Sequence, residues 1–280
     1  MPASLKNLPF AERLDQATAR CGSLCVGIDP HPASVAAWGL PNDVKGLEAF
    51  SRGLVAALSS DVACFKPQSA FFEAFGPAGL MVLGAVLHDI ADAGAISILD
   101  VKRGDIGSTM DAYARAYLAD GAELAADAIT VSPFLGFRSL APAIDLARRT
   151  SRGVFVLART SNPEGTAVQL AVEPPGVTIS TPSSVAQRVV LEANAVNRAA
   201  GTPLVGLVVG ATLLSMDIDL DGFDGWILAP GIGAQGGDVE HLRALFGQRR
   251  RVLPTVSRAV TDAGPDPSAL KNCALALSNC

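Results

Sequence analysis

The sequence predicts an α/β fold in which eight parallel strands and their connecting helices close into a (β/α)8 TIM barrel. Three observations lead to this prediction. Short apolar runs alternate along the chain with segments whose apolar residues recur at helical spacing. The apolar runs are continuous, which is typical of strands buried on both faces. The length of 280 residues is ordinary for one barrel of this kind.

The chain is expected to open with an amphipathic helix over residues 8–20. Eight strand candidates then follow in order: Leu24–Asp29, Val62–Lys66, Ile96–Lys102, Ala128–Ser132, Val154–Arg159, Leu204–Gly210, Trp226–Pro230 and Val252–Ser257. An open, doubly wound sheet is the alternative arrangement for the same elements.

Helical segments are expected between the strands, and three of their starts are predicted from capping residues. Ser108 or Thr109 is a candidate N-cap for the helix after the third strand. Thr181-Pro182 predicts a helix start with proline at the first helical position. Asp238 is a candidate cap for the helix that precedes the last strand.

No internal repeat, low-complexity tail or linker divides the chain, so residues 1–280 are expected to form a single barrel domain. The connection 160–180 after the fifth strand is long and rich in proline and glycine. Long loops inside compact domains are usually functional, although a disordered insertion is the alternative.

Composition restricts the classes of function. Hydrophobic residues make up 49% and charged residues 18%, which allows a large core. The net charge of −5 argues against general nucleic-acid binding. Five cysteines with no C-x-x-C pair indicate neither a disulfide framework nor a zinc site. With no signal-peptide pattern and no apolar run of membrane-spanning length, we expect a cytoplasmic protein without a membrane anchor.

Opposite charges end the third predicted strand. Asp100 and Lys102 are two residues apart, so both should point to the same side of the strand, and Asp105 follows where the strand ends. Charges at the end of a buried strand are costly unless they pair or act in chemistry. An ion pair that only closes a layer of the barrel is the structural alternative.

Further polar residues end other strands, and the parallel topology brings them to one mouth of the barrel. Asp29 ends the first strand and Lys66 the second. The glycine-rich run 230–238 follows the seventh strand, and Arg258 follows the eighth. Loops after strands seven and eight are a common phosphate site in barrels, and an arginine adds charged donors. We therefore expect a phosphate group to bind there.

These residues resemble a known family. Asp100-Val-Lys102-Arg-Gly-Asp105-Ile106 resembles the D-x-K-x-x-D-I signature of orotidine 5′-phosphate decarboxylases. The stretches 27–30, 65–68 and 160–165 and the loop 230–238 resemble the same family, in particular its second bacterial sequence group. D-x-K-x-x-D alone also occurs in sugar-phosphate decarboxylases and aldolases, and Lys66 and the Gln235 loop narrow the match.

The resemblance implies a homodimeric enzyme that decarboxylates orotidine 5′-phosphate to UMP, the last step of de novo pyrimidine synthesis, with neither metal nor organic cofactor. It also implies roles for individual residues. The catalytic set is Lys66, Asp100, Lys102 and Asp105. The substrate-binding set is Asp29 for the ribose, Thr109 from the neighbouring subunit, Ser161 for the pyrimidine, and Gln235 and Arg258 for the phosphate, with Pro230 at the base of the phosphate site. Asp105, like Thr109, would act across the dimer interface.

The residues fit this chemistry independently. Loss of CO2 from C6 of a pyrimidine leaves a carbanion in the ring plane, and a preorganised cation such as Lys102 can stabilise it and then donate the proton. One alternative is a related Mg²⁺-dependent sugar-phosphate lyase, against which Lys66 argues because a lysine would repel a divalent cation. The other is a non-catalytic barrel that binds a phosphate ligand.

Overall fold

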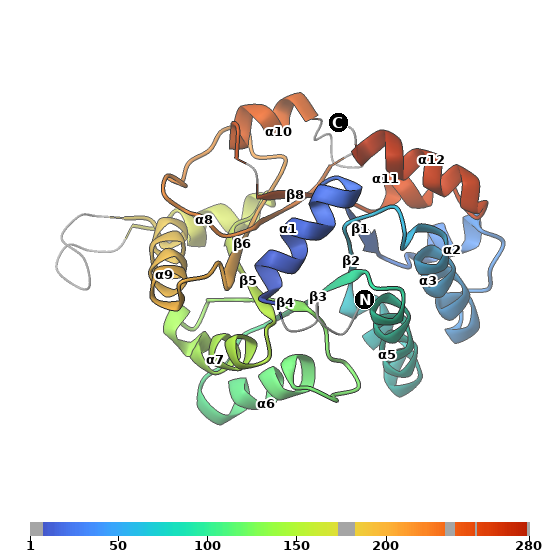
Figure 1. The fold of residues 1–280 in the computed structure, drawn as a ribbon, viewed down its shortest axis with the longest axis horizontal. Helices are drawn as coiled ribbons and strands as arrows, with labels where there is room; N and C mark the ends of the chain where they lie inside the picture. Colours follow the sequence, from blue (N-terminus) through green and yellow to red (C-terminus); the bar gives the residue numbers. More distant parts are fainter. Residues whose placement is uncertain (1–7, 173–182, 233–238, 250, 279–280) are drawn as a thin grey trace.

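The computed structural model describes residues 8–172, 183–232, 239–249 and 251–278, and it contains a ring of strands surrounded by helices (Figure 1). The strands are β1 (Cys25–Ile28), β2 (Cys64–Pro67), β3 (Ile96–Arg103), β4 (Ala128–Val131), β5 (Gly153–Arg159), β6 (Val205–Val209), β7 (Ile227–Pro230) and β8 (Val252–Val256). Each pairs in parallel with its neighbours in sequence order, and β1 also pairs with β8 through Cys25↔Thr255. The barrel is therefore closed, as predicted, and the open-sheet alternative is wrong.

Helices cover the outside of this ring (Figure 1). They are α2 (Pro32–Ala37), α3 (Val44–Leu58), α4 (Ser69–Glu73), α5 (Gly76–Asp92), α6 (Gly107–Leu118), η1 (Phe137–Leu140), α7 (Ala141–Arg149), η2 (Pro163–Gly165), α8 (Thr166–Gln169), α9 (Val185–Ala200), α10 (Val239–Phe246), α11 (Arg258–Thr261) and α12 (Pro267–Ser278). None of the helices in the described ranges is long and apolar enough to cross a membrane.

Two of the predicted helix starts lie outside the described residues, and the third is wrong. Neither Thr181-Pro182 nor Asp238 belongs to the described ranges; α9 begins at Val185, and the Ser184 hydroxyl caps it by accepting the amide of Gln187. Helix α6 begins at Gly107, so Ser108 and Thr109 lie within its first turn. Its N-cap position is Ile106, without a side-chain cap, because β3 and the turn after it deliver the chain directly into the helix.

The long connection after β5 contains structure that the sequence did not predict. A 3-10 turn, η2, and the short helix α8 occupy residues 163–169. Val172 then pairs with Ser184 in an isolated antiparallel bridge. Hydrogen bonds between Gln169 and Thr160, at 2.7 and 2.9 Å, hold this short helical segment against the end of β5.

The opening helix α1 (Phe10–Cys21) lies across the centre of the ring in Figure 1. Phe10, Leu14 and neighbouring apolar residues pack in one cluster with the inward-facing residues of the strands. The Phe10 ring meets the edge of Phe155 at a centroid distance of 5.9 Å. Because α1 covers the amino ends of the strands with apolar side chains, the barrel is closed at that end and open at the other.

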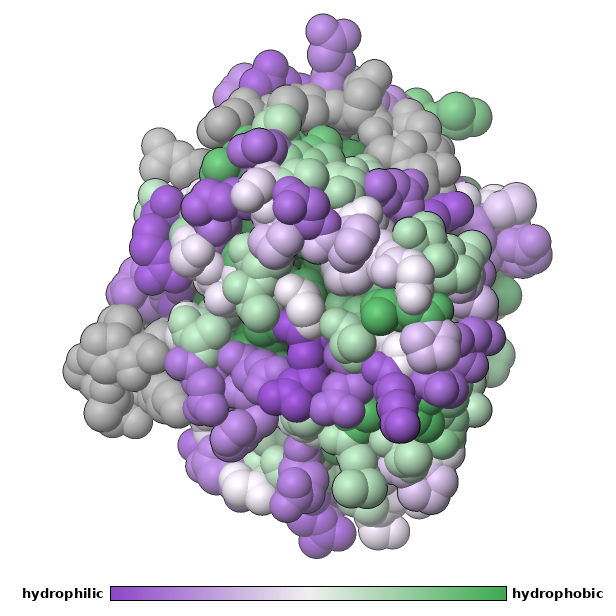
Figure 2. All heavy atoms as spheres, turned by 90° about the vertical axis from the view of Figure 1, so that its right-hand side faces the viewer, coloured by the Kyte–Doolittle hydropathy of each residue, from purple (hydrophilic) through white to green (hydrophobic). Residues whose placement is uncertain are grey.

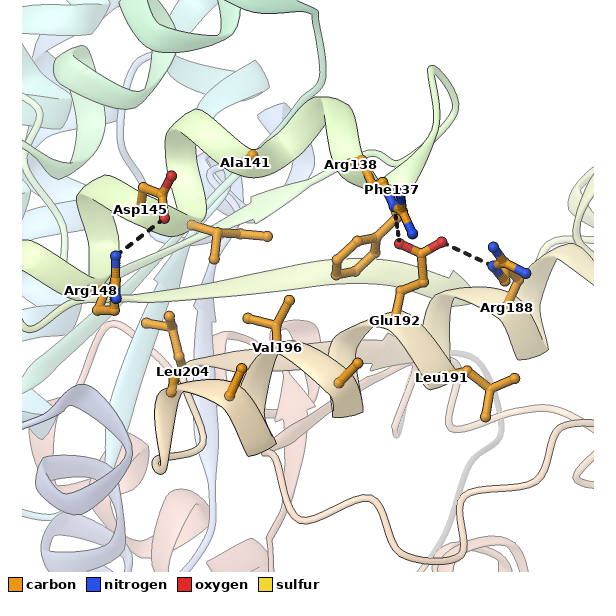
Figure 3. Close-up of a pocket in the computed structure, with 14 residues that line it drawn as sticks. Phe137, Arg138, Ala141, Asp145, Arg148, Arg188, Leu191, Glu192, Val196 and Leu204 are labelled. Atoms are coloured by element: carbon orange, nitrogen blue, oxygen red, sulfur yellow. Dashed lines mark hydrogen bonds and ion pairs between the residues drawn. The ribbon is translucent and has the colours of Figure 1, made fainter. Parts of the chain in front are cut away.

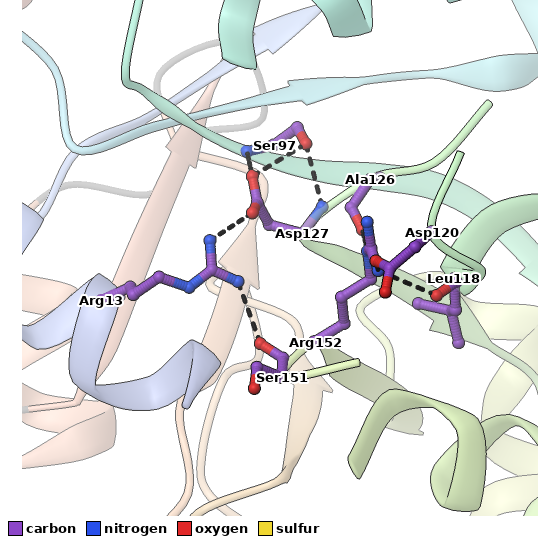
Figure 4. Close-up of polar contacts among 8 residues, drawn as sticks. All are labelled: Arg13, Ser97, Leu118, Asp120, Ala126, Asp127, Ser151 and Arg152. Atoms are coloured by element: carbon purple, nitrogen blue, oxygen red, sulfur yellow. Dashed lines mark hydrogen bonds and ion pairs between the residues drawn. The ribbon is translucent and has the colours of Figure 1, made fainter. Parts of the chain in front are cut away.

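A polar network fastens α1 to the strands (Figure 4). The guanidinium of Arg13 forms an ion pair with Asp127, just before β4, and donates to the carbonyl of Ser151 at 3.0 Å. Asp127 in turn accepts the Ser97 amide at 2.9 Å and the Ser97 hydroxyl at 3.2 Å. Arg13, Ser97 and Asp127 are called the amino-end network below, and it links α1, β3 and β4.

The side of the molecule formed by the helices at the right of Figure 1 is shown in Figure 2. Hydrophilic residues are interspersed there with smaller hydrophobic patches. Met81 of α5 is the most exposed large apolar side chain of that helix, at 77%. Isolated apolar residues of this kind are normal on a protein surface and indicate no function.

Candidate active site

A cavity of about 260 Å³ opens at the carboxyl ends of the strands. Every strand, or the residue that directly follows it, contributes to the wall. The predicted site residues that line the cavity are Asp29, Lys66, Asp100, Lys102, Pro230 and Arg258. The structure thus brings together side chains that are spread over more than two hundred residues of sequence, because parallel strands end at the same side.

Three of these residues form a chain of alternating charge. The Lys66 ammonium lies 3.0 Å from one carboxylate oxygen of Asp100, and the Lys102 ammonium lies 2.6 Å from the other. The side chains of Lys66 and Asp100 are 6% and 8% exposed, whereas that of Lys102 is 46% exposed. This Lys66–Asp100–Lys102 group is called the Lys–Asp–Lys chain, and Lys102 is its accessible end.

The pairing keeps the buried members charged. Burial alone would lower the pKa of Lys66, but the carboxylates of Asp100 and Asp29 outweigh it and raise that pKa above its usual range. Burial alone would raise the pKa of Asp100, but Lys66 and Lys102 outweigh it and hold that pKa well below its usual range. Both groups are therefore ionised at neutral pH.

An irregularity in β3 sets the geometry of the chain. Leu99 pairs with Ile129 and Arg103 with Val131, so Asp100, Val101 and Lys102 all lie opposite the single residue 130 of β4. Lys102 has φ of +44°, a left-handed conformation that is rare for a residue with a side chain. Asp100 and Lys102 meet as predicted, but through this bulge and not through regular strand alternation.

Asp29 presents an unused acceptor. Its Oδ1 lies 3.9 Å from the Lys66 ammonium, beyond hydrogen-bond distance, and is buried without a hydrogen-bond partner among the described residues. The Ser257 hydroxyl, also at the cavity wall, is likewise buried without one. Buried polar atoms are normally hydrogen-bonded, so both are suited to receive polar groups of a ligand.

The structure does not bring every predicted residue to the cavity. The Asp105 carboxylate accepts the amide of Ile106 at 2.8 Å, and Thr109 is exposed on α6; neither lines the cavity of this chain. Ser161 is also absent from the wall and packs against the end of β6, where a Cβ at Gly210 would come within 2.7 Å of the Ser161 nitrogen. Gln235 lies outside the described residues.

Two residues that the sequence prediction missed contact Asp100. The Gln68 side-chain amide donates to Oδ2 at 3.0 Å, and the Thr130 hydroxyl donates to Oδ1 at 2.8 Å. A signal for both was present. Gln68 is two residues beyond Lys66, and Thr130 is the polar residue within the apolar run of β4.

A larger cavity of about 770 Å³ lies on the outside of the barrel between α7 and α9 (Figure 3). Its wall is mostly apolar, and charged residues at its rim pair with one another. Arg148 pairs with Asp145 at 3.6 Å, and Glu192 pairs with Arg188 at 2.9 Å and with Arg138 at 3.6 Å. None of the predicted site residues lies there, so the smaller cavity at the barrel mouth is the candidate active site.

Among the described residues, the candidate site contains no recognisable arrangement of metal ligands. Within the described ranges, no group of three or more His, Cys, Asp or Glu side chains is placed to hold a metal ion. The nearest neighbours of the Asp100 carboxylate are instead two ammonium groups, a hydroxyl and an amide, which satisfy its oxygens directly.

The closed barrel and the charged residues at the carboxyl ends of its strands define a TIM-barrel enzyme, since active sites of this class lie at that end. Comparison with known families identifies the group within the class. The model of the orotidine 5′-phosphate decarboxylase / HUMPS family matches residues 22–273. The chain belongs to this family, and the resemblance predicted from the sequence is confirmed.

Relatives and solved structures agree with this assignment. The chain is 52% identical over 265 residues to the orotidine 5′-phosphate decarboxylase of Salinispora arenicola, covering 94% of this chain and 93% of that one. It is 49% identical over 269 residues to that of Streptomyces coelicolor, covering 95% and 94%. The crystal structure of a Streptomyces avermitilis protein, 48% identical, matches with a TM-score of 0.91 over 100% of this chain and 96% of that one. Leishmania donovani OMP decarboxylase, 29% identical, matches with a TM-score of 0.74 over 98% and 100%.

Proposed function

We propose that this protein converts orotidine 5′-phosphate to UMP and CO2, the last step of de novo pyrimidine synthesis, in the cytoplasm. Family membership and near full-length relatives of that name support the reaction. The observation that carries the proposal is the Lys–Asp–Lys chain, in which a buried carboxylate holds the half-exposed ammonium of Lys102 at the cavity.

Lys102 is the catalytic group in this proposal. The bond between C6 and the carboxyl carbon breaks, CO2 leaves, and the electron pair stays on C6 in the ring plane. The Lys102 ammonium stabilises that carbanion and donates its proton to C6, which completes UMP; the neutral lysine then takes a proton from water. Lys102 suits this role because its side chain is 46% exposed while its charge is anchored by Asp100.

Asp100 and Lys66 prepare Lys102 for this step. The substrate carboxylate would lie beside the Asp100 carboxylate, so repulsion there falls as CO2 departs. Lys66 holds Asp100 from the other side at 3.0 Å and keeps it ionised. The charged groups are thus already in position before the substrate binds, which is the requirement for a preorganised site.

The remaining cavity residues bind the nucleotide. The free oxygen of Asp29 accepts a ribose hydroxyl, and Arg258, which lines the same cavity as Pro230, receives the phosphate. Gln235 is assigned as a further phosphate ligand on the family resemblance. Ser161 is assigned to the pyrimidine on the family resemblance alone. Because the phosphate is remote from C6, its binding energy can position the ring for reaction.

The active unit is proposed to be a homodimer in which Asp105 and Thr109 reach the partner's site. Their position outside this chain's own cavity supports the proposal. Three large apolar side chains near them, Ile106, Phe134 and Leu135, are 61%, 76% and 52% exposed, and they follow the ends of β3 and β4 at the barrel mouth. An exposed apolar group of this kind is suited to be covered by a second copy.

The reaction is tested by mixing the pure protein with orotidine 5′-phosphate and following the ultraviolet absorbance as substrate becomes UMP. We expect turnover that is unchanged by EDTA. Turnover lost in EDTA and restored by Mg²⁺ would contradict the metal-free mechanism, and no turnover at all would contradict the proposed function.

The shared site is tested by complementation. Lys102→Ala and Asp105→Ala are expected to be nearly inactive separately. When they are mixed so that subunits exchange, each mixed dimer has one site with both residues intact, and random pairing restores about a quarter of wild-type activity. No recovery, with exchange verified by a tagged subunit, would place Asp105 in its own chain's site.

A further inference from the structure

The hydroxyl of Thr130 occupies an unusual position between β3 and β4. It donates to Asp100 Oδ1 at 2.8 Å and accepts the backbone amide of Lys102 at 3.0 Å. A carboxylate can only accept and an amide can only donate, so the single hydroxyl proton must point at Asp100. Thr130 is 1% exposed, and these two bonds fix its orientation.

The same hydroxyl supplies a hydrogen-bond acceptor to β3 where regular backbone pairing with β4 is interrupted. Three residues of β3 lie opposite Thr130, because the register shifts between Leu99 and Arg103. A bulge of this size leaves backbone groups without their regular partners. The Thr130 hydroxyl takes the Lys102 amide at the point where the Lys102 backbone has φ of +44°. Strained conformations of this kind persist only where surrounding contacts hold them.

We propose that Thr130 is a positioning residue for the proposed decarboxylation, holding the Asp100 carboxylate and the Lys102 backbone so that the Lys102 ammonium meets the reacting carbon. The inference rests on the proposed function. Without the hydroxyl, Asp100 retains its bonds to Lys66, Gln68 and the Lys102 ammonium, but the backbone amide of Lys102 loses its partner. The Lys102 side chain is half exposed, so no packed wall would hold it in place instead.

Ser97 provides a matched control at the opposite end of the same two strands. Its hydroxyl also bridges β3 to the chain at β4: it donates to the Asp127 carboxylate at 3.2 Å and accepts the Asp127 amide at 3.0 Å. Ser97 thus contacts one carboxylate and one amide, as Thr130 does, but it lies in the amino-end network. Removing it tests whether any hydroxyl bridge between these strands affects the rate.

The experiment compares Thr130→Ser, Thr130→Ala, Thr130→Val and Ser97→Ala, with kcat and KM for orotidine 5′-phosphate, UMP affinity and melting temperature measured for each. We expect Thr130→Ala and Thr130→Val to lower kcat by about 10- to 100-fold, the range for a lost hydrogen bond to a charged group. KM and UMP affinity should change less than about threefold. Thr130→Ser should keep at least about a third of wild-type kcat.

The pattern separates positioning from simple structural damage. Ser97→Ala should lower the melting temperature and leave kcat unchanged, whereas Thr130→Ala and Thr130→Ser, which differ by one oxygen atom, should differ in kcat. If Thr130→Val fails to fold, the difference in kcat between Thr130→Ala and Thr130→Ser still tests the inference. Equal kcat for the pair, or an equal loss of kcat in Ser97→Ala, would overturn the inference. An inactive wild-type protein would instead overturn the proposed function.

Discussion

The two ends of the barrel each contain a buried network of charges, and the networks differ in whether a ligand can reach them. At the amino end, Arg13 and Asp127 are 5% and 21% exposed and are bonded to neighbours on other elements, although the Arg13 Nε is buried without a hydrogen-bond partner among the described residues. Helix α1 covers this end. At the carboxyl end, the Lys–Asp–Lys chain finishes in the half-exposed Lys102 and lines a cavity, together with Asp29 and its unpartnered buried oxygen.

The difference separates a network that holds elements together from one that is prepared for a ligand. A network that is covered by α1 and joined to neighbouring elements by an ion pair and several hydrogen bonds contributes rigidity. A network that lines a cavity with an accessible cation, a free acceptor and a strained backbone residue can bind a ligand, and backbone strain of this kind is typical of active sites. Stability and catalysis are therefore expected to respond to mutations at opposite ends.

The largest expected effect is at the carboxyl end. Lys102→Ala should lower kcat by about a thousandfold or more, because it removes both the cation at the carbanion and the proton donor. UMP should still bind and the melting temperature should not fall. Lys45→Ala, at an exposed position of α3, is the control and should match wild type. A Lys102→Ala variant that keeps more than about a tenth of the wild-type rate would contradict the proton-donor role.

The amino end should show the reverse response. Arg13→Ala leaves the Asp127 carboxylate without its main cationic partner and should lower the free energy of unfolding by about 3 kcal/mol. The kcat at a temperature where the variant is folded should equal that of wild type. Urea unfolding and steady-state kinetics on the same preparation test this together, and a tenfold loss of kcat in folded Arg13→Ala would mean that the two ends are coupled.

Arg258→Ala, also at the carboxyl end, should affect substrate binding more than the chemical step. We expect KM for orotidine 5′-phosphate to rise by about 30-fold, from the loss of a charge-assisted contact to the phosphate. The rate with the phosphate-free nucleoside should hardly change. Arg148→Ala, at the outer face of α7, is the matched control. Equal losses on both substrates would show that Arg258 does not hold the phosphate.

The smallest expected effect is the pH dependence of stability. Because the pKa of Asp100 is depressed in the folded protein, its stabilising contribution is present above pH 4 and is lost as the pH falls below that. The raised pKa of Lys66 acts in the other direction: its contribution is complete at neutral pH and is lost only in strong alkali.

Urea unfolding between pH 5 and pH 2.5 measures this effect. Wild type should lose stability more steeply than Asp100→Asn, by up to about 1.4 kcal/mol per pH unit. Parallel curves below pH 4 would mean that the Lys–Asp–Lys chain does not hold Asp100 ionised in the folded state.

Much of the barrel could be predicted from the sequence because its signals are local. All eight strand candidates correspond to observed strands, since each is a continuous apolar run bounded by polar or glycine residues. The gathering of Asp29, Lys66, Asp100, Lys102 and Arg258 followed from topology alone, because parallel strands in a closed barrel all end on one side. Neither prediction required knowledge of which side chains touch.

What only the tertiary structure decided depends on contacts between residues far apart in the chain. The Lys102 conformation depends on a hydroxyl 28 residues away, and α1 is fastened to the strands at the amino end by Arg13, which reaches an aspartate 114 residues away. The short helix in the connection after β5 and the uncapped start of α6 were missed for a related reason. Periodicity and capping preferences predict only the secondary structure of a residue's own segment. A bulge, a buried ion pair or a docked turn is instead stabilised by a distant group that the closed barrel brings beside it.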